Sequence, residues 1–157
     1  MLLWRLSANA YAQRFDGGYG LRRDGRWNGR GRPVTYCSTG PAPCILEKLV
    51  HVVDASSLPD DLVFVRYEAP DDLQVEEVHL DRLPERWRML GDLTRRLGND
   101  WLDGVSACLL RVPSVIVPIS DTRDRNVLIN HRHEDARRIA VSRIDPFRYD
   151  SRLFKFR

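Results

Sequence analysis

Alternating apolar and polar positions predict short β-strands along most of the chain. The clearest case is residues 34–38, where alternation places Val34, Tyr36 and Ser38 on one face of an extended segment. The Pro-Asp-Asp sequence at 70–72 is typical of a turn between two strands. Further strands are expected at 2–6, 62–67, 75–80, 107–112, 115–118, 126–130 and 139–143.

Two segments have helical rather than alternating periodicity. In residues 41–54 one side of the expected helix carries Glu47, Lys48, His51 and Asp54. The apolar side consists of Ile45, Leu46, Leu49, Val50, Val52 and Val53. A second helix is expected over 89–102, with a break at Gly98, and a helical turn over 134–138. Since helices and strands do not alternate regularly, the sequence favours an α+β fold over a doubly wound sheet.

Residues 8–33 lack apolar periodicity and are expected to form one long loop. Six glycines lie between Gly17 and Gly31, without the preceding strand and following helix that a dinucleotide-binding glycine motif requires. Structureless loops of this length are unusual in small domains and frequently carry function. The alternative is a mobile surface segment. Because no repeat or linker divides the chain, residues 1–157 are expected to form one domain.

Composition narrows the class of protein. With 43% hydrophobic and 30% charged residues and a mean hydropathy of −0.41, the chain is typical of a globular protein. No apolar run approaches the ~20 residues that span a bilayer. The first residues do not form a signal peptide, so we expect a cytoplasmic protein. Cys37, Cys44 and Cys108 have no CxxC spacing, and we expect reduced, buried thiols rather than a zinc site.

Arginine dominates the positive charge. All 25 basic residues except Lys48 and Lys155 are arginine, and the net charge is +3 with a pI near 9.0. Arginine can bind a phosphate group through two parallel hydrogen bonds, so recognition of phosphate is one interpretation. A general compositional bias toward arginine is the other.

Three side chains on consecutive predicted elements could act on a nucleotide. Arg26 offers a phosphate clamp, Tyr36 a stacking ring and Glu47 a carboxylate. A carboxylate can stabilise the oxocarbenium ion that develops when an N-glycosidic bond breaks. The alternative for Glu47 is a solvent-facing helical residue without a special role.

Two further motifs suggest weaker candidates. Ser114 follows Pro113 in an apolar stretch, where its hydroxyl either binds a ligand or satisfies a local backbone group. His131 and His133 are spaced to share one strand face, but supporting metal ligands at standard spacing are lacking. We therefore expect no metal site, and expect these histidines to cap or pack the turn after Asn130.

Six blocks in order along the chain resemble the RES-domain family, the toxins of bacterial RES–Xre toxin–antitoxin modules. The blocks are WRLS, GRWNGRGRPVTYCS, ILEKLVH, RVPSVIVP, NVLINHRHED and FRYDSRLF, and together they cover essentially the whole chain. The resemblance implies an ADP-ribosyltransferase-like core, a split β-sheet flanked by helices. It also implies destruction of cellular NAD by cleavage of the nicotinamide–ribose bond, with water or inorganic phosphate as acceptor and no metal.

The resemblance assigns the family's site residues to Arg26, Tyr36, Glu47 and Ser114. Arg26 would bind the pyrophosphate, and Tyr36 would stack on nicotinamide or hold the adjacent ribose. Glu47 would bind a ribose hydroxyl and favour the cationic transition state, while Ser114 would donate a hydrogen bond in the cleft. Asn28 and Arg5 are expected to support these residues in binding NAD.

The resemblance also implies a partner, an Xre-type helix-turn-helix antitoxin that blocks the cleft. Two other functions stay open at this point. A toxin of the same fold could transfer ADP-ribose to a protein. More distantly, the arginine–glycine segment could belong to an RNA-binding module or nuclease, although the small net charge and the acidic segment 41–104 disfavour direct binding of nucleic acid.

Overall fold

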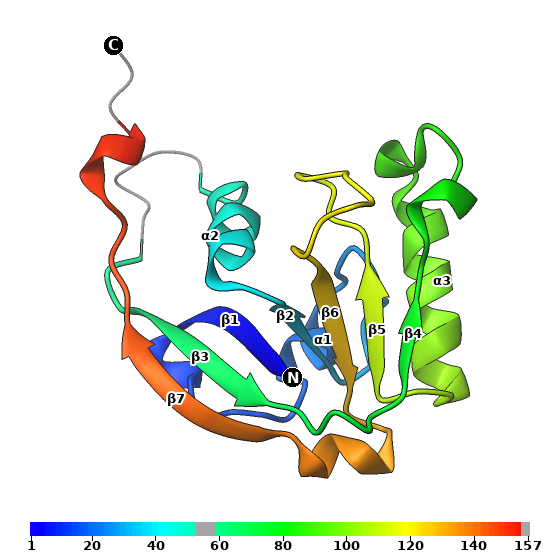
Figure 1. Ribbon diagram of the computed structural model, residues 1–157, viewed down its shortest axis with the longest axis horizontal. Coiled ribbons are helices and arrows are strands. Elements are labelled where there is room, and N and C mark those ends of the chain that lie inside the picture. The colour runs from blue at the N-terminus through cyan, green and yellow to red at the C-terminus, as the bar shows by residue number, and fades with distance from the viewer. Residues whose placement is uncertain (53–58, 155–157) are drawn as a thin grey trace.

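The computed structural model describes residues 1–52 and 59–154, which fold around a seven-stranded mixed sheet in the order β4-β5-β6-β2-β1-β3-β7 (Figure 1). The fold class is α+β, as predicted. The strands are β1 (Leu2–Ala8), β2 (Val34–Ser38), β3 (Leu62–Glu68), β4 (Val75–Glu77), β5 (Leu109–Val112), β6 (Asn126–Asn130) and β7 (Ala140–Pro146). The α-helices among the described residues are α1 (Gly18–Arg22), α2 (Pro41–Leu49) and α3 (Gly91–Gly104).

The sheet is split into two halves, in agreement with the expected architecture. In one half β1, β3 and β7 pair antiparallel, and in the other β2, β6 and β5 pair antiparallel while β4 runs parallel to β5. Only the pair Trp4–Ser38 joins β1 to β2, and from there the two halves diverge (Figure 1). Helix α2 packs on β1 and β2, above this junction.

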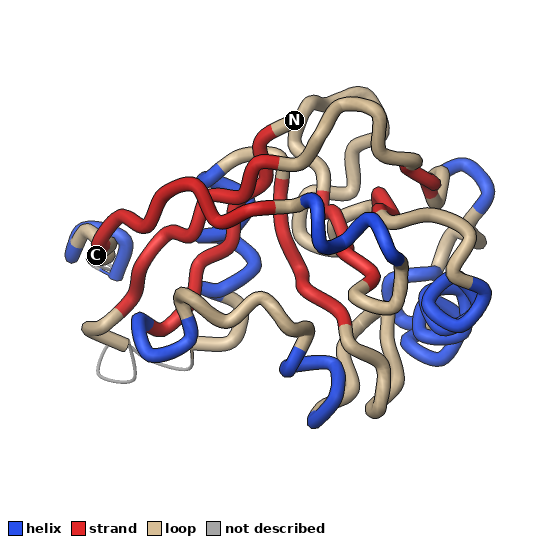
Figure 2. Tube along the Cα trace, turned by 90° about the horizontal axis from the view of Figure 1, so that it is seen from below, coloured by secondary structure: helices blue, strands red, loops and turns tan. Residues whose placement is uncertain are grey.

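The two faces of the β2–β6–β5 half bury different cores. Val34, Leu110 and Leu128 pack on one face with Trp101 and Leu102 of α3. Cys37, Val127 and Ile129 pack on the other face, together with β3 residues. Viewed from below, α3 lies nearly end-on at one side of the molecule and the 3₁₀ turn Ser151–Phe154 lies at the other (Figure 2).

The faces of β2 follow the predicted alternation. Tyr36 lies opposite Leu128 and Ser38 opposite Asn126 in the antiparallel register, so all four share the face that α3 covers. The three cysteines are free and buried, as expected. Within the described residues no helix has the length and apolar character needed to cross a bilayer.

Several elements differ from their predicted extents. Residues 8–33 are not one structureless loop, because they contain the 3₁₀ turn Asn9–Tyr11 and helix α1. Helix α3 continues through Gly98 without a break. The reason for glycine at this position is that a Cβ would clash with the carbonyl oxygen of Trp27. Glycine therefore serves close packing here rather than helix termination.

Residues 115–118 form no strand, and the predicted strand at 75–80 is limited to Val75–Glu77. The hydroxyl of Ser114 accepts the backbone N–H groups of Ile116 and Val117, which makes a local turn in place of a ladder. Val53 and Asp54, at the end of the predicted first helix, lie outside the described residues.

Helix α2 is rotated relative to its predicted orientation. Leu46 and Val50 were expected in the apolar side, but they are 41% and 59% exposed. The residue that α2 buries against β1 is Cys44, whose thiol donates to the carbonyl oxygen of Trp4. Because Cys44 sets the inward side, Glu47 on the next turn also points inward and is half-buried.

Candidate active site

Glu47 is held by two hydrogen bonds from distant parts of the chain. Its Oε1 accepts the Ser114 hydroxyl at 2.8 Å and the Asn126 side-chain amide at 2.6 Å. Its Oε2 makes no hydrogen bond within the described residues. The carboxylate is therefore fixed in orientation, with one oxygen occupied and the other left to meet a ligand.

The Ser114 hydroxyl is fully used inside the protein. Its oxygen accepts hydrogen bonds from two backbone N–H groups, each at 3.0 Å, while its O–H donates a hydrogen bond to Glu47. A serine hydroxyl has one donor and two acceptor positions, so all are occupied. Of the two roles considered for Ser114, ligand binding and hydrogen bonding to local backbone groups, the structure shows the second. The hydroxyl also orients Glu47.

Asn126 and Ser38 are contacts of the site that sequence reasoning missed. The Ser38 hydroxyl donates to Asn126 Oδ1 at 2.9 Å, which turns the Asn126 amide nitrogen toward Glu47. The signal was present in the sequence as polar residues at the ends of two strands that are otherwise buried. Pairing β2 with β6 was needed to see that they adjoin.

A small cavity lies beside Glu47. Its lining includes Glu47, Ser114 and Asn126, with Leu46 and Arg125 at its sides, and its volume is about 60 Å³. Ligand pockets for molecules of drug size measure roughly 300–1,000 Å³. The cavity therefore has room for a small group only, and a dinucleotide must extend over the adjoining surface.

Tyr36 anchors the arginine–glycine segment through its hydroxyl. This group accepts the backbone N–H of Trp27 at 3.0 Å and donates to Asn28 Oδ1 at 2.7 Å. Burial raises the pKa of Tyr36 above its usual range, so the hydroxyl keeps its proton. Gly25 allows this approach, since a Cβ there would lie 2.5 Å from the Tyr36 oxygen.

Asn28 is completely buried and completes this anchor. Its amide nitrogen donates to the carbonyl oxygens of Arg23 and Gly29, at 3.1 and 3.2 Å, while its Oδ1 accepts the Tyr36 hydroxyl. The side chain thus holds the loop in shape and contacts the Tyr36 hydroxyl.

Arg26 lies between this anchor and the start of α3. Its guanidinium is 5.7 Å from the centre of the Trp87 ring and donates to the carbonyl oxygen of Arg88. Burial, and next to it the charge of Arg95, lowers the pKa of Arg26. Arg26 makes no direct contact with Glu47 among the described residues. The two are linked through Tyr36 and Ser38, neighbours on one face of β2.

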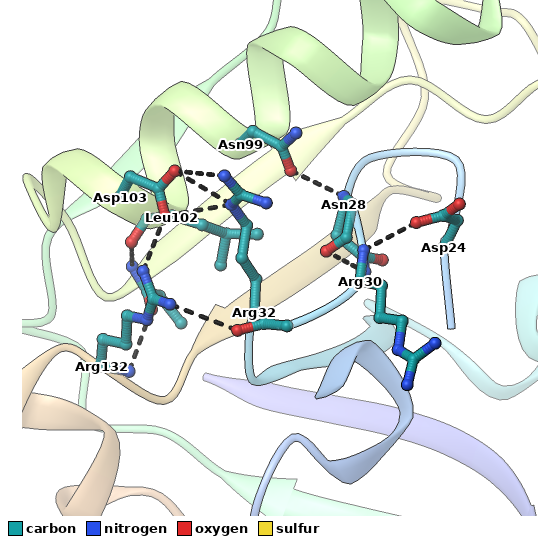
Figure 3. A network of polar contacts seen from close by, with 11 residues as sticks. Asp24, Asn28, Arg30, Arg32, Asn99, Leu102, Asp103 and Arg132 are labelled. Carbon is teal, nitrogen blue, oxygen red and sulfur yellow. Dashed lines mark hydrogen bonds and ion pairs between the residues drawn. The ribbon is translucent and has the colours of Figure 1, made fainter. Parts of the chain in front are cut away.

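A network of polar contacts fixes the same segment to α3 (Figure 3). Asp103 binds Arg32 through hydrogen bonds of 2.6 and 3.0 Å and Arg132 through one of 2.6 Å. Asn99 accepts the backbone N–H of Gly29 at 2.7 Å. The Arg32 hydrogen bond is the main cause that lowers the pKa of Asp103. The segment is therefore an anchored element rather than a mobile surface.

The structure places Arg5 away from this face. Trp4 pairs with Ser38, so the next residue along β1 points to the opposite side of the sheet. Arg5 donates to the carbonyl oxygens of Tyr11 and Arg14 and lies 5.7 Å from the centre of the Tyr67 ring. Arg5 therefore stabilises the chain after β1 and lies apart from Glu47 and Tyr36.

The histidines pack and cap, as expected. His131 bonds to the Thr35 hydroxyl through Nε2 at 2.8 Å and packs edge-on against Phe15, and His133 accepts the backbone N–H of Asp135 at the start of a 3₁₀ turn. They line an open hollow of about 360 Å³ on the face opposite Tyr36. No group of three potential metal-ligating side chains is found within the described residues.

His131 predicts a specific dependence of stability on pH. Burial lowers its pKa to about 4, against about 6.5 in an unfolded chain. Between these values the unfolded chain binds a proton that the folded protein does not. The free energy of unfolding should therefore fall as the pH drops from about 6.5 to about 4, by up to about 1.4 kcal/mol per pH unit.

Urea unfolding of the wild type and of His131→Gln over this pH range checks the prediction. In the variant the free energy of unfolding should change much less with pH. The difference in this free energy between the wild type and the variant should therefore become smaller at low pH. His79→Gln, at an exposed position, serves as control. Equal slopes in the wild type and His131→Gln would contradict the assignment.

Comparison with known proteins matches this chain to one family along nearly its whole length. The family model described as RES domain matches residues 2–150. "Toxin Res" of Pseudomonas putida is 43% identical over 155 residues, which cover 98% of this chain and 100% of that protein. "Prs ADP-ribosylating toxin" of Sphingobium sp. is 31% identical over 159 residues, 97% of this chain and 96% of that protein.

A solved structure has the same fold. It is a chain of the M. tuberculosis MbcT–MbcA toxin–antitoxin complex, with a TM-score of 0.65 over 93% of this chain and 83% of that chain. The sequences are 14% identical, so this likeness concerns the fold alone.

Proposed function

Because this chain belongs to the RES-domain family, we propose that it is the toxin of a bacterial toxin–antitoxin module and that it consumes NAD in the cytoplasm. The reaction is cleavage of the bond between nicotinamide and ribose. One domain, residues 1–157, carries it. The observation that supports this most is Glu47, a half-buried carboxylate whose Oε1 is held by Ser114 and Asn126 and whose Oε2 is left for substrate.

The reaction balances without a cofactor other than the substrate itself. When the C1′–N bond of NAD breaks, its electron pair moves to the positively charged ring nitrogen, so nicotinamide leaves as a neutral molecule. The ribose gains positive charge, which the Glu47 carboxylate stabilises. An oxygen of water or phosphate then bonds to C1′. Water loses one proton to give ADP-ribose, and phosphate gives an ADP-ribose phosphate ester.

The other residues position the substrate. Arg26 binds the pyrophosphate, and Tyr36 presents its ring, since its hydroxyl is used by Trp27 and Asn28. Ser114 acts through Glu47, because its hydroxyl has no free position for a ligand. Asn28 acts through Tyr36.

An enzyme that consumes NAD requires control in its host cell. We propose that an Xre-type antitoxin binds this chain and closes the surface around Glu47. Leu46 on α2 lines the cavity beside Glu47 and is exposed, so it offers the antitoxin an apolar contact. Mixing purified antitoxin with the toxin should stop NAD consumption in proportion to complex formed.

Product analysis tests the proposal and its alternative. Purified protein incubated with NAD should release nicotinamide together with ADP-ribose, or with its phosphate ester when phosphate is supplied. A relative named as an ADP-ribosylating toxin supports a second candidate, transfer of ADP-ribose to a protein. In that case label from adenylate-labelled NAD stays on a macromolecule in cell lysate. NAD left intact in buffer, phosphate and lysate would contradict both.

A further inference from the structure

Arg26 and Arg95 both lie near the start of α3. Gly91, the first residue of the helix, lies against Arg26, so that a Cβ there would be 3.7 Å from Arg26 Nη1. Arg95 follows Gly91 by four residues, which places it on the same side of the helix one turn later. Together with burial, which is the larger cause, its positive charge lowers the pKa of Arg26.

Within the described residues, the positive charge of this pair is only partly balanced by acidic side chains. Arg26 contacts a carbonyl oxygen and the Trp87 ring, neither of which carries a negative charge. Arg95 pairs with Asp92 at 3.0 Å, but the Asp92 side chain is fully exposed, where an ion pair contributes little. In the part of the chain that the structure describes, Asp92 is therefore the one acidic side chain paired with these two half-buried arginines, and it is exposed to solvent.

Each guanidinium also retains an unused donor. The Nε atoms of Arg26 and Arg95 are both shielded from solvent and have no hydrogen-bond partner among the described residues. A buried donor without a partner is costly, and two like charges in one place add to the cost. Such an arrangement is typical of a functional site that an anion completes.

We propose that Arg26 and Arg95 together form a phosphate-binding site that takes the pyrophosphate of a dinucleotide. The inference rests on the proposed function for the identity of the ligand and adds Arg95 to its binding residues. Two guanidinium groups can donate to separate oxygens of a pyrophosphate, which bears one negative charge on each phosphate.

The position of the pair fits this substrate. Tyr36 lies between it and Glu47 on one face of the sheet: its hydroxyl meets the loop that carries Arg26, and two residues further along β2 Ser38 begins the chain of contacts to Glu47. A dinucleotide held by its pyrophosphate at the arginines can therefore extend its nicotinamide ribose past Tyr36 toward Glu47. The arginines set the direction in which the substrate lies.

Binding of ADP to the Glu47→Gln protein, measured by calorimetry, tests the pair separately from catalysis. Adding Arg95→Ala or Arg26→Ala should weaken ADP binding about 10- to 150-fold, the range for the loss of a hydrogen bond to a charged group. Arg95→Lys should restore part of it, because a lysine keeps the charge without the fork. Adenosine, which lacks phosphate, should bind equally to all these proteins.

Arg96→Ala is the matched control, since Arg96 is the adjacent residue, is exposed and makes no ion pair within the described residues. It should bind ADP like its parent. Thermal unfolding adds a readout with the opposite sign: Arg95→Ala should melt at the same temperature or higher, because it removes a repelling charge. A structural arginine would lower the melting temperature when removed.

Unchanged ADP affinity in Arg95→Ala would overturn the inference, and so would an equal loss of affinity in Arg96→Ala. Inorganic phosphate that binds as tightly as ADP, and in the same Arg95-dependent manner, would assign the site to the acceptor instead of the substrate and also overturn it. ADP binding that depends on Arg95 in a protein that leaves NAD intact would refute the proposed function while the anion site stands.

Discussion

Replacing Glu47 by Gln should lower the kcat of NAD cleavage by about 10²- to 10³-fold, the usual cost of removing one preorganised group that stabilises transition-state charge. The substitution keeps the shape of the side chain. Its remaining oxygen can still accept from Ser114 and Asn126, so the geometry at that oxygen is retained. What is lost is the negative charge at the position of Oε2, which matters only as the ribose becomes cationic.

The KM for NAD should change less than kcat, because the charge of Glu47 stabilises the cationic transition state more than the bound substrate. Nicotinamide release measured over a range of NAD concentrations separates the two constants. Glu76→Gln, a change of the same kind at an exposed position on β4, should leave both as in the wild type. A folded Glu47→Gln protein with wild-type kcat refutes the assigned role.

Replacing Tyr36 by Phe should lower the free energy of unfolding by about 1–3 kcal/mol, although a single oxygen is removed. The Trp27 N–H and the Asn28 Oδ1 each lose their partner, and Asn28 is fully buried. Arg26 adjoins Trp27, so the loop that presents it also loosens. We expect kcat/KM for NAD to fall on the order of tenfold from this misplacement.

Tyr19→Phe is a matched control for this change. Tyr19 packs edge-on against Tyr36, but its hydroxyl makes only a 3.5 Å contact with the carbonyl oxygen of Asp24 and the residue is 55% exposed. Urea unfolding and initial rates of NAD cleavage should therefore match the wild type. If Tyr36→Phe is as stable as Tyr19→Phe, the hydroxyl does not anchor the loop.

Most strands could be predicted from the sequence because local alternation determines them. The sheet face of Tyr36 and Ser38 followed from residues 34–38 alone. What failed depended on packing and side-chain hydrogen bonds that the alternation of residues does not show. The helix break expected at Gly98 was wrong, because this glycine is needed for close packing against the backbone of Trp27. The strand expected at 115–118 was wrong, because the Ser114 hydroxyl accepts hydrogen bonds from backbone N–H groups of this segment.

The candidate site shows the same limit. Periodicity alone placed Glu47 on the polar side of its helix, yet Cys44 packs against β1 and turns Glu47 inward. Asn126 and Ser38 could not be connected to Glu47 before the register of β2 and β6 was known. Arg95 belongs to no sequence motif, and it becomes a candidate binding residue only because the structure places Gly91, one helical turn earlier, against Arg26.

The most direct test of the proposed NAD site is a crystal structure of the Glu47→Gln protein with NAD. We predict the pyrophosphate on Arg26 and Arg95, the nicotinamide ribose beside residue 47, and the ring of Tyr36 against the substrate between them. Density for NAD in the hollow beside His131, on the opposite face of the sheet, or on α3 without contact to β2, would contradict it.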